Sequence, residues 1–344
     1  MTETSKIRIR ISNKLRWGIL GCANIAVEAV MPAIAASELN VLEAVASRDV
    51  AKGRAVAERF GIAKAYGSYE ELLRDPDIDA VYIPLPNHLH KEWTIKAAEA
   101  GKHVLCEKPI ALNAREAEEM AEACARAGVV LAEAFMYRHH PRIDTILGLV
   151  RGGEIGELRA IRGSFTFNNA EDHANIRLRP EWGGGSLYDV GVYPLTAARL
   201  ITGSEPEAVT VHALFSPEHG NVDMMASGLV EFAGGVSLAF DCGMWADYRN
   251  TLEIVGTKGR IEVPESFKPE PGTPDCIVYA NGQRRVIEPS PVNQYSLQAD
   301  DFARAVFGET PQRFAPDDAV KNMRLVEACL LSARERRRVT LGNQ

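Results

Sequence analysis

The residues best suited to chemistry in this chain are a lysine, an aspartate and a tyrosine in two separate segments. Lys108 stands between an apolar run that ends at Cys106 and the proline Pro109. Open α/β sheets bind ligands outside the carboxyl ends of their strands, so this position predicts that Lys108 faces a ligand. Asp189 and Tyr193 are four residues apart and share one face if their segment is helical. Together the three side chains predict proton transfer that accompanies hydride transfer.

Short apolar runs alternate with helical patterns over residues 15–140, and this part is predicted to form an α/β domain. Such alternation is typical of βαβ units around a parallel sheet. The expected strands are 15–20, 41–46, 80–84, 102–106 and 129–133, and the expected helices are 51–60, 89–100 and 114–127. Residues 1–14 are polar and basic and are predicted to form a flexible extension.

The pattern changes in residues 141–344, which are predicted to form a second domain of the α+β class that binds the substrate. Strands follow one another there with few helices between them, which favours a mostly antiparallel sheet. The expected strands are 159–167, 207–215, 226–232, 236–242, 251–255 and 260–263, with helices at 142–152, 294–307 and 316–336. The proline-rich segment 264–274 is predicted to be a surface loop.

The bulk composition excludes several classes of function. A formal net charge of -7 provides no basic footprint for nucleic acid. No segment approaches the roughly 18 uninterrupted apolar residues of a membrane helix, and the N-terminus lacks the apolar core of a signal peptide. Six scattered cysteines without a C-x-x-C pair favour buried, reduced thiols. These features predict a cytoplasmic protein that binds neither nucleic acid nor membranes.

The first expected strand leads into a variant of the dinucleotide-binding fingerprint, Gly21-x-Ala23-x-x-Ala26. Gly21 permits a tight turn, and small residues after it let the backbone approach a pyrophosphate. The helix that follows would hold the phosphates at its N-terminus, near Asn24 and Ile25. Alanine at the second position departs from the full glycine pattern, so the motif depends on its place after a first strand.

The second expected strand ends in Ser47-Arg48, where an NAD enzyme usually carries an acidic residue for the ribose hydroxyls. A serine hydroxyl and a guanidinium suit a 2′-phosphate instead, and the guanidinium can stack on the adenine. The sequence therefore predicts NADP as the cofactor, with Lys52 as a further phosphate contact.

Two prolines stiffen the chain before Asn87, which is predicted to cap the next helix and to contact a ribose. His88 and His90 are possible metal ligands, but no cysteine or carboxylate cluster completes a site, so no metal is expected. His90 is expected near the nicotinamide, and Glu107 is expected to contact the ribose or brace the turn. The predicted cofactor-binding residues are Gly21, Ala23, Asn24, Ile25, Ser47, Arg48, Lys52, Leu85, Pro86, Asn87, His90, Glu107 and Lys108.

These motifs in this order resemble the Gfo/Idh/MocA family of oxidoreductases, over about residues 15 to 340. Glu107-Lys108-Pro109 followed by Gly-Gly-Gly…Asp-x-Gly-x-Tyr at 183–193 is a specific pairing. The resemblance implies a Rossmann domain followed by an α+β domain with a large, mostly antiparallel open sheet. That sheet commonly forms the oligomer interface, so a homodimer or homotetramer is expected. The resemblance also implies a cis peptide between Lys108 and Pro109.

Many members of the family carry Asp-x-x-x-His where this chain has Asp189 and Tyr193. In this it is similar to the branch of glucose–fructose oxidoreductase, NADP-dependent xylose dehydrogenase, dimeric dihydrodiol dehydrogenase and 3-ketosugar reductase, and Tyr193 is implied to be the acid–base group. A phenol with a pKa of about 10 is a poor base at neutral pH. We therefore expect the Lys108 ammonium to lower the pKa of Tyr193 and to stabilise alkoxide charge. Asp189 is expected to orient the lysine or a sugar hydroxyl.

Substrate contacts are expected from Arg138, Asn168, Arg179 and Trp182, with Arg177 in the same segment. This polar and weakly cationic set favours a neutral sugar or polyol. The leading hypothesis is an NADP(H)-dependent aldose dehydrogenase or ketosugar reductase. The alternatives are a trans-dihydrodiol dehydrogenase and a non-enzymatic NADP-binding regulator on the same fold.

Overall fold

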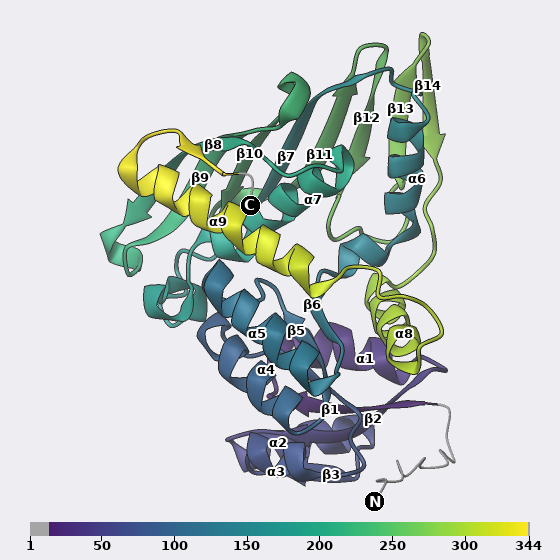
Figure 1. Ribbon diagram of the computed structural model, residues 1–344, viewed down its shortest axis with the longest axis vertical. Coiled ribbons are helices and arrows are strands. Elements are labelled where there is room, and N and C mark those ends of the chain that lie inside the picture. The colour runs from purple at the N-terminus through teal and green to yellow at the C-terminus, as the bar shows by residue number, and fades with distance from the viewer. Residues whose placement is uncertain (1–13, 343–344) are drawn as a thin grey trace, which may run out of the picture.

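The chain, seen here as a computed structural model, forms one sheet of six strands and one of nine (Figure 1). The structure describes residues 14–342, so residues 1–13 of the expected extension lie outside the described part. Within residues 14–342 no helix is long and apolar enough to cross a membrane. The α/β class expected from the sequence is confirmed.

The first sheet is parallel throughout and has the strand order β3-β2-β1-β4-β5-β6, which is that of a dinucleotide-binding fold. Its central strands β1, β4 and β5 are buried on both faces, as expected for a parallel sheet covered by helices. They are β1 Leu15–Leu20, β2 Asn40–Ala46, β3 Lys64–Tyr66, β4 Ala80–Ile83, β5 His103–Glu107 and β6 Leu131–Ala134.

Helices cover both faces of this sheet. The π-helical turn η1 Ala26–Val30, α1 Met31–Ala35 and α2 Val50–Phe60 pack on one face, and α3 Tyr69–Arg74, α4 His90–Glu99 and α5 Ala114–Ala127 pack on the other. Capping explains two of the boundaries. The Asn113 side chain accepts a bond from the Glu116 amide at the start of α5, and Gly128 ends that helix in the left-handed conformation.

The second sheet has the order β14-β13-β12-β11-β7-β10-β9-β8-β15, and only the pair β7 and β10 is parallel. A mostly antiparallel second sheet is therefore confirmed. Its strands are β7 Leu158–Asn168, β8 Ala208–Ser216, β9 Val222–Glu231, β10 Ser237–Gly243, β11 Trp245–Gly256, β12 Gly259–Pro264, β13 Cys276–Ala280, β14 Gln283–Ile287 and β15 Val339–Thr340.

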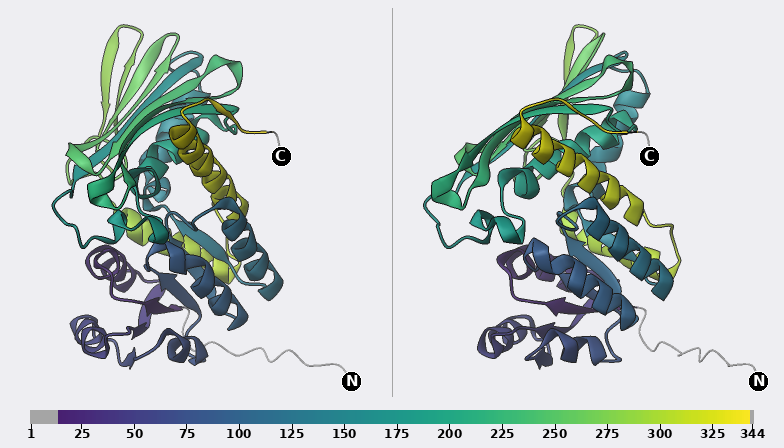
Figure 2. Two further views of the ribbon diagram at one scale, coloured as in Figure 1. Left: turned by 90° about the vertical axis from the view of Figure 1, so that its left-hand side faces the viewer. Right: turned by 60° about the vertical axis from the view of Figure 1, so that its left-hand side comes forward.

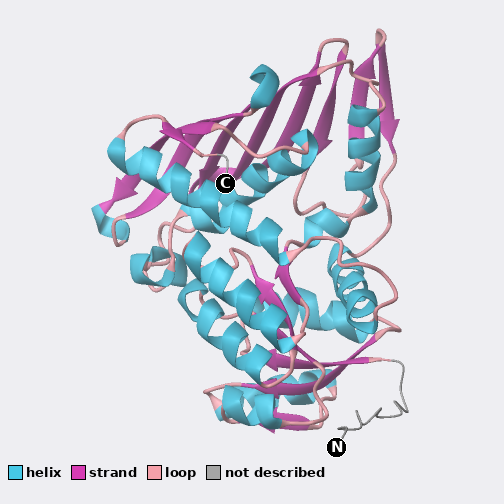
Figure 3. Ribbon diagram, viewed as in Figure 1, coloured by secondary structure: helices cyan, strands magenta, loops and turns pink. Residues whose placement is uncertain are grey.

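The helices of the second part gather on one face of this sheet, and no helix of the described chain covers the other face (Figures 2 and 3). They are α6 Pro141–Arg151, α7 Val192–Thr202 and α9 Pro316–Glu335, with the π-helical turn η6 Leu187–Gly191 leading directly into α7. The uncovered face has a hollow of about 650 Å³, lined among others by Arg162, Ser227, Ala239 and Glu253.

Helix α8, Gln294–Phe307, follows the second sheet in sequence but packs against the first. The Phe302 ring lies 5.1 Å from the Trp17 ring of β1. The Asp300 carboxylate accepts hydrogen bonds from Ser37 (2.5 Å) and Asn40 (2.9 Å), which flank the start of β2. The chain therefore returns to its first sheet after completing most of the second.

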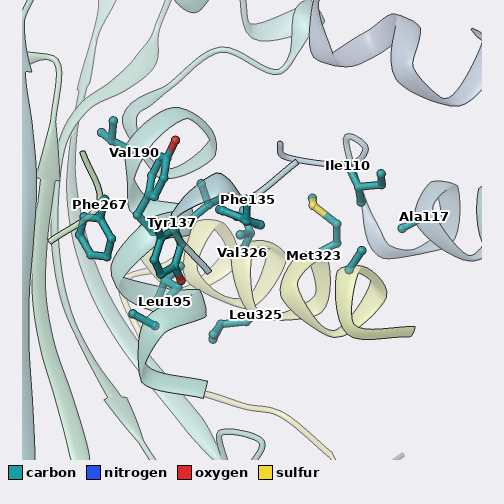
Figure 4. Close-up of a cluster of buried hydrophobic side chains, with 14 of the residues drawn as sticks. Ile110, Ala117, Phe135, Tyr137, Val190, Leu195, Phe267, Met323, Leu325 and Val326 are labelled. Carbon is teal, nitrogen blue, oxygen red and sulfur yellow. The ribbon is translucent and has the colours of Figure 1, made fainter. Parts of the chain in front are cut away.

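A continuous hydrophobic core joins the two parts (Figure 4). It runs from Ile110, next to the first sheet, through Phe135 and Tyr137 to Phe267 beneath the second. Helix α9 contributes Met323, Leu325 and Val326 to the same core. The two sheets are thus packed around shared side chains.

The structure contains elements that were not expected from the sequence. These are the short strand β3, helix α3 and the hairpin β13–β14, whose turn places Asn281 (φ 54°) and Gly282 (φ 73°) in the left-handed region. Asn-Gly between two strands is the strongest hairpin signal, so this hairpin could have been predicted. The segment 264–274 is not only a surface loop, because Phe267 within it is fully buried.

Candidate active site

A cleft of about 620 Å³ lies where the two parts of the molecule meet. The segments after β1, β4 and β5 form one side, and β7, the stretch from 174 to 193, β11 and α8 form the other. The carboxyl ends of parallel strands thus open into the cleft, as the position of Lys108 predicts.

Lys108, Asp189 and Arg177 form a half-buried charged cluster in this cleft. The Lys108 ammonium donates to the backbone carbonyl of Asp189 (2.7 Å) and lies 3.4 Å from its Oδ1. Arg177 Nε donates to the other carboxylate oxygen at 2.6 Å. Burial alone would raise the pKa of Asp189, but the two cations outweigh it and hold that pKa at about 2. Asp189 is therefore an anion that orients Lys108.

Tyr193 lies beside this cluster, with its ring 5.0 Å from the Lys108 ammonium. Aromatic rings of Phe135, Tyr137, Phe165 and Phe267 surround it at centroid distances of 5.1 to 5.8 Å. Its hydroxyl is 3.9 Å from the sulfur of Met136. The aromatic packing fixes the ring, so the phenol has a defined position in the cleft.

The expectation that Lys108 lowers the pKa of Tyr193 is wrong in this structure. Burial and the carboxylates of Glu107 and Asp189 raise the pKa of the phenol well above its usual range, and only Arg177 opposes them. The physical reason is that the Lys108 charge is directed at Asp189. Tyr193 is therefore a protonated phenol at neutral pH, which makes it a proton donor in the first instance.

Asp223 of β9 holds the beginning of the helix that carries Asp189 and Tyr193. Its carboxylate accepts from the Ser186 hydroxyl (2.8 Å) and from the Leu187 amide (2.7 Å). Gly185 has φ +119°, and a Cβ there would lie 2.1 Å from Asp223 Oδ1. The glycine run is thus needed for the close approach of β9 to this turn.

The turn at Lys108 has the cis peptide to Pro109 that the resemblance implies. Glu107 braces it: its carboxylate accepts from the Lys108 amide at 3.3 Å and from the Tyr82 hydroxyl at 2.5 Å. Burial raises the pKa of Glu107, while the Lys108 charge opposes that rise.

The glycine turn after β1 has the geometry expected of a dinucleotide site. Gly21 has φ +110°, and a Cβ there would lie 3.1 Å from the Leu85 side chain. Ala23, Asn24 and Ile25 line the cleft at the start of the helix that follows. Leu85, with Pro86 beside it, lines the cleft from the end of β4.

Ser47 and Arg48 directly follow β2, Lys52 lies in the first turn of α2, and all three are outside the lining of the cleft. The Arg48 side chain is exposed and lies close enough to the Tyr69 hydroxyl to oppose the rise in its pKa that burial causes. Lys52 acts in the same way on the buried thiol of Cys22. Two cations are therefore placed beyond the glycine turn.

Two predicted roles at the end of β4 are corrected. Asn87 does not cap a helix with its side chain, because its amide donates to the Gly183 carbonyl at 2.9 Å, although it does line the cleft. His90 is fully buried, and its ring nitrogens lie 2.7 Å from the Leu85 carbonyl and 2.9 Å from the Pro109 carbonyl. It braces the Lys108 turn from behind and is not placed to touch a nicotinamide.

Of the four residues predicted to contact the substrate, the structure places only Trp182 in the lining of the cleft. Arg138 is buried away from the cleft, in an ion pair with Asp318 (2.6 Å) and 3.5 Å above the Phe314 ring. Asn168 and Arg179 are exposed and do not line the cleft. Trp182 does line it and stacks on His88 at 5.2 Å. Within residues 14–342, no three His, Cys, Asp or Glu side chains are grouped as metal ligands.

Several lining residues were missed by reasoning from the sequence. They come from segments expected to be strands, loop or a closing helix: Met136, Phe165, Phe167, Tyr248, Lys268 and Tyr295. No local motif marks them, because strands and helices far apart in the sequence bring them to the cleft. Arg177 was visible only as one cation among several near the glycine run.

Comparison with known proteins agrees with this geometry. The family model for "Oxidoreductase family, NAD-binding Rossmann fold" matches residues 15–135, and that for "GFO/IDH/MocA C-terminal domain" matches residues 143–262. The chain belongs to the Gfo/Idh/MocA family. This membership confirms the resemblance drawn from the motifs at Gly21, Lys108 and Tyr193.

Members of the Gfo/Idh/MocA family that are similar to this chain act on sugars and diols, according to their names. The chain is 40% identical to a D-xylose 1-dehydrogenase (NADP(+)) of Haloferax volcanii, over 93% of this chain and 97% of the relative. It is 35% identical to the trans-1,2-dihydrobenzene-1,2-diol dehydrogenase of Mus musculus, over 80% of each chain. A 3-ketoreductase from Actinomadura kijaniata, solved with NADP and TDP-benzene, has a TM-score of 0.88 at 32% identity and covers 93% of this chain and 98% of its own.

Proposed function

We propose that the protein is an NADP(H)-dependent oxidoreductase that interconverts an alcohol and a carbonyl group on a sugar or polyol. The observation that supports this most directly is the cluster of Lys108, Asp189 and Arg177 beside Tyr193. The cluster lies in a cleft that the dinucleotide-type turn after β1 also lines. The named relatives act on xylose, a ketosugar or a cyclic diol, and they share this fold.

The residues at the first sheet fit NADP. Gly21 leaves room where a Cβ would meet Leu85, and Ala23 lets the backbone come close to a pyrophosphate. Arg48 and Lys52 provide positive charge for a 2′-phosphate, and Ser47 provides a hydroxyl. When bound, NADP supplies or accepts the hydride at its nicotinamide ring.

The side chains of this protein handle the proton and the charge on the reacting oxygen. In reduction, the protonated phenol of Tyr193 donates its proton to the carbonyl oxygen. In oxidation, the phenol first loses its proton to solvent, and the phenolate then takes a proton from the alcohol. Lys108, held by Asp189, stabilises negative charge that develops on the same oxygen. Arg177 keeps Asp189 ionised and so keeps Lys108 in place.

A steady-state assay tests the proposed function. The purified protein is incubated with NADP+ or NAD+ and a panel of pentoses, hexoses and cyclic diols, and ketosugars with NADPH are assayed in the reverse direction. We expect turnover of at least one compound with NADP(H) preferred. Tight NADPH binding with no turnover across both panels would instead favour a non-enzymatic regulator.

The aromatic lining of the cleft favours a second candidate, a trans-dihydrodiol dehydrogenase. Phe165, Phe167, Trp182 and Tyr248 line the cleft, and flat apolar rings suit a cyclohexadiene diol as well as the face of a sugar. Preference for dihydrodiols over free aldoses in the same panel would select this candidate.

We further propose that the uncovered face of the second sheet forms the interface of a homodimer or homotetramer. That face is open, and it carries the hollow lined by Arg162, Ser227, Ala239 and Glu253. Exposed Leu214 and Leu229 lie on the neighbouring strands β8 and β9. A large open sheet with exposed apolar side chains is expected to be covered in the assembled protein.

A further inference from the structure

Tyr295 is a second phenol at the reacting end of the cleft, and it comes from helix α8. It lines the cleft together with Glu107, Lys108 and Tyr193. Its ring packs against both hydrophobic clusters of the molecule, so it is fixed at the junction of the two parts. Its amide donates to the Asn293 side chain (2.9 Å), which caps α8.

The Tyr295 hydroxyl has no hydrogen-bond partner among the residues that the structure describes, whereas the hydroxyls of Tyr82 and Tyr188 each have one. Tyr82 donates to Glu107 at 2.5 Å, and Tyr188 donates to the Leu112 carbonyl at 2.6 Å. A part-buried hydroxyl without a partner loses free energy unless a ligand or water meets it. Because Tyr295 lines the cleft, a bound substrate can form a hydrogen bond with this hydroxyl.

The Tyr295 hydroxyl lies near the reacting groups, because it lines the same cleft and their charges act on its pKa. Burial raises the pKa of Tyr295, Tyr193 and Glu107 reinforce the rise, and Lys108 opposes it. The phenol is therefore protonated at neutral pH and can both donate and accept a hydrogen bond. Tyr295 reaches the cleft from α8, while Tyr193 reaches it from α7.

We propose that Tyr295 binds the hydroxyl on the carbon next to the reacting carbon, so that the cleft selects vicinal diols and α-hydroxy carbonyl compounds. This inference rests on the proposed function, in which Tyr193 and Lys108 hold the reacting oxygen. Aldoses and cyclic trans-diols share such a neighbouring hydroxyl, so the same contact in one cleft can bind both classes of substrate. A site built to bond a hydroxyl discriminates against an analogue that lacks it, because its own polar group is then left unpaired.

The test compares an aldose that the enzyme oxidises with its 2-deoxy analogue, in the wild type and in Tyr295→Phe. We expect the wild type to prefer the 2-hydroxy sugar by about 10-fold or more in kcat/KM, as one hydrogen bond allows. In Tyr295→Phe this ratio should fall toward about 1, mainly through a higher KM for the 2-hydroxy sugar. The phenylalanine ring preserves the packing of α8, and the thermal unfolding midpoint verifies this.

Tyr279→Phe is the matched control, since Tyr279 lies on β13 under the Arg260 guanidinium (3.9 Å) and far from the cleft lining. It should keep the wild-type ratio. An unchanged ratio in Tyr295→Phe, or a wild type that does not distinguish the two sugars, overturns this inference alone. No turnover by the wild type with any sugar or diol overturns the proposed function and this inference with it. If Tyr295→Phe does not fold, the wild-type ratio still decides.

Discussion

Asp189 serves two cations at once, and this arrangement determines what each side chain in the cleft can do. One carboxylate oxygen faces Lys108 and the other accepts from Arg177. Burial and the carboxylates of Glu107 and Asp189 raise the pKa of Tyr193 against the opposing charge of Arg177, so the phenol stays protonated. The division of roles is therefore electrostatic: Asp189 orients, Lys108 carries the positive charge, and Tyr193 holds the proton.

The importance of Lys108, Asp189 and Tyr193 could be predicted because their local motifs are distinctive. The roles of Arg138 and His90 could not, because their partners lie elsewhere in the fold. Arg138 is satisfied by Asp318 of α9, and His90 by two backbone carbonyls around the Lys108 turn. A polar residue near a motif is as often structural as ligand-binding, and only its burial in the folded chain distinguishes the two roles.

Replacing either proton-handling residue should remove turnover without removing cofactor binding. We expect Tyr193→Phe and Lys108→Met each to lower kcat by roughly 100-fold or more, the usual contribution of a positioned acid–base group. NADPH fluorescence titration should give a Kd close to that of the wild type for Tyr193→Phe. Lys258→Met changes an exposed lysine outside the cleft lining and should leave kcat unchanged. Full turnover in Tyr193→Phe would contradict its assignment as proton donor.

At the scale of elements, the helix that bears Asp189 and Tyr193 depends on a strand from elsewhere in the sheet. Asp223 of β9 holds its first turn, and Gly185 makes room for that contact. The strands and helices were largely predictable from periodicity, but this contact was not, since no pattern in the sequence relates β9 to the glycine run. The four-residue spacing of Asp189 and Tyr193 predicts a helix, but it does not predict that Asp189 lies in the π-helical turn η6.

The glycine at this contact should tolerate no side chain. Gly185→Ala would place a methyl group 2.1 Å from Asp223 Oδ1 at a residue with φ +119°. Gly272→Ala is the matched control, because Gly272 also has a positive φ (+89°) but has open space around its Cβ. We expect Gly185→Ala to lower the free energy of unfolding by about 2 kcal/mol more than the control, measured by urea denaturation. Equal effects would show that only the backbone conformation matters.

The end of β6 should impose a pH dependence on stability. The half-buried Glu133 carboxylate accepts from the Ile110 amide (2.9 Å) and from Asn322 of α9 (3.1 Å), and loss of solvent contact raises its pKa from 4.5 to about 7. The folded protein therefore holds this proton to higher pH than the unfolded chain. The stability it contributes is complete below about pH 4.5 and is lost as the pH rises through about 7.

Glu133→Gln removes this titration. Relative to the wild type, the variant should gain about 3 kcal/mol in free energy of unfolding between pH 5 and pH 8, with the unfolding measured in urea at both values. A constant difference between the two proteins across this range would mean that Glu133 titrates normally.

At the scale of the whole molecule, no helix among residues 14–342 covers one face of the second sheet, while the shared core fixes the other face to the rest of the chain. Membership of the family could be read from motifs, and so could the presence of a second sheet. The hairpin β13–β14 is marked by Asn281-Gly282, whereas the edge strand β15 could not be predicted, because its two residues are too few to form a pattern.

A charged residue on the uncovered face should break the proposed assembly. Ala239 of β10 lines the hollow and pairs with Leu229 of β9. We expect Ala239→Arg to shift the protein from a dimer or tetramer to a monomer, measured by light scattering during size-exclusion chromatography. Val292→Lys, at an exposed loop position, should not do so. A wild-type monomer at micromolar concentration would rule out this interface.

The return of α8 to the first sheet has a consequence for how the chain is made. As the protein leaves the ribosome, residues 15–140 emerge with the apolar surface around Trp17 still bare, because Phe302 has yet to be synthesised. The nucleotide-binding half is therefore completed only after residues 294–307 have been synthesised. A chain that lacks residues 294–307 but keeps α9 should expose that surface and aggregate, whereas the whole chain should not.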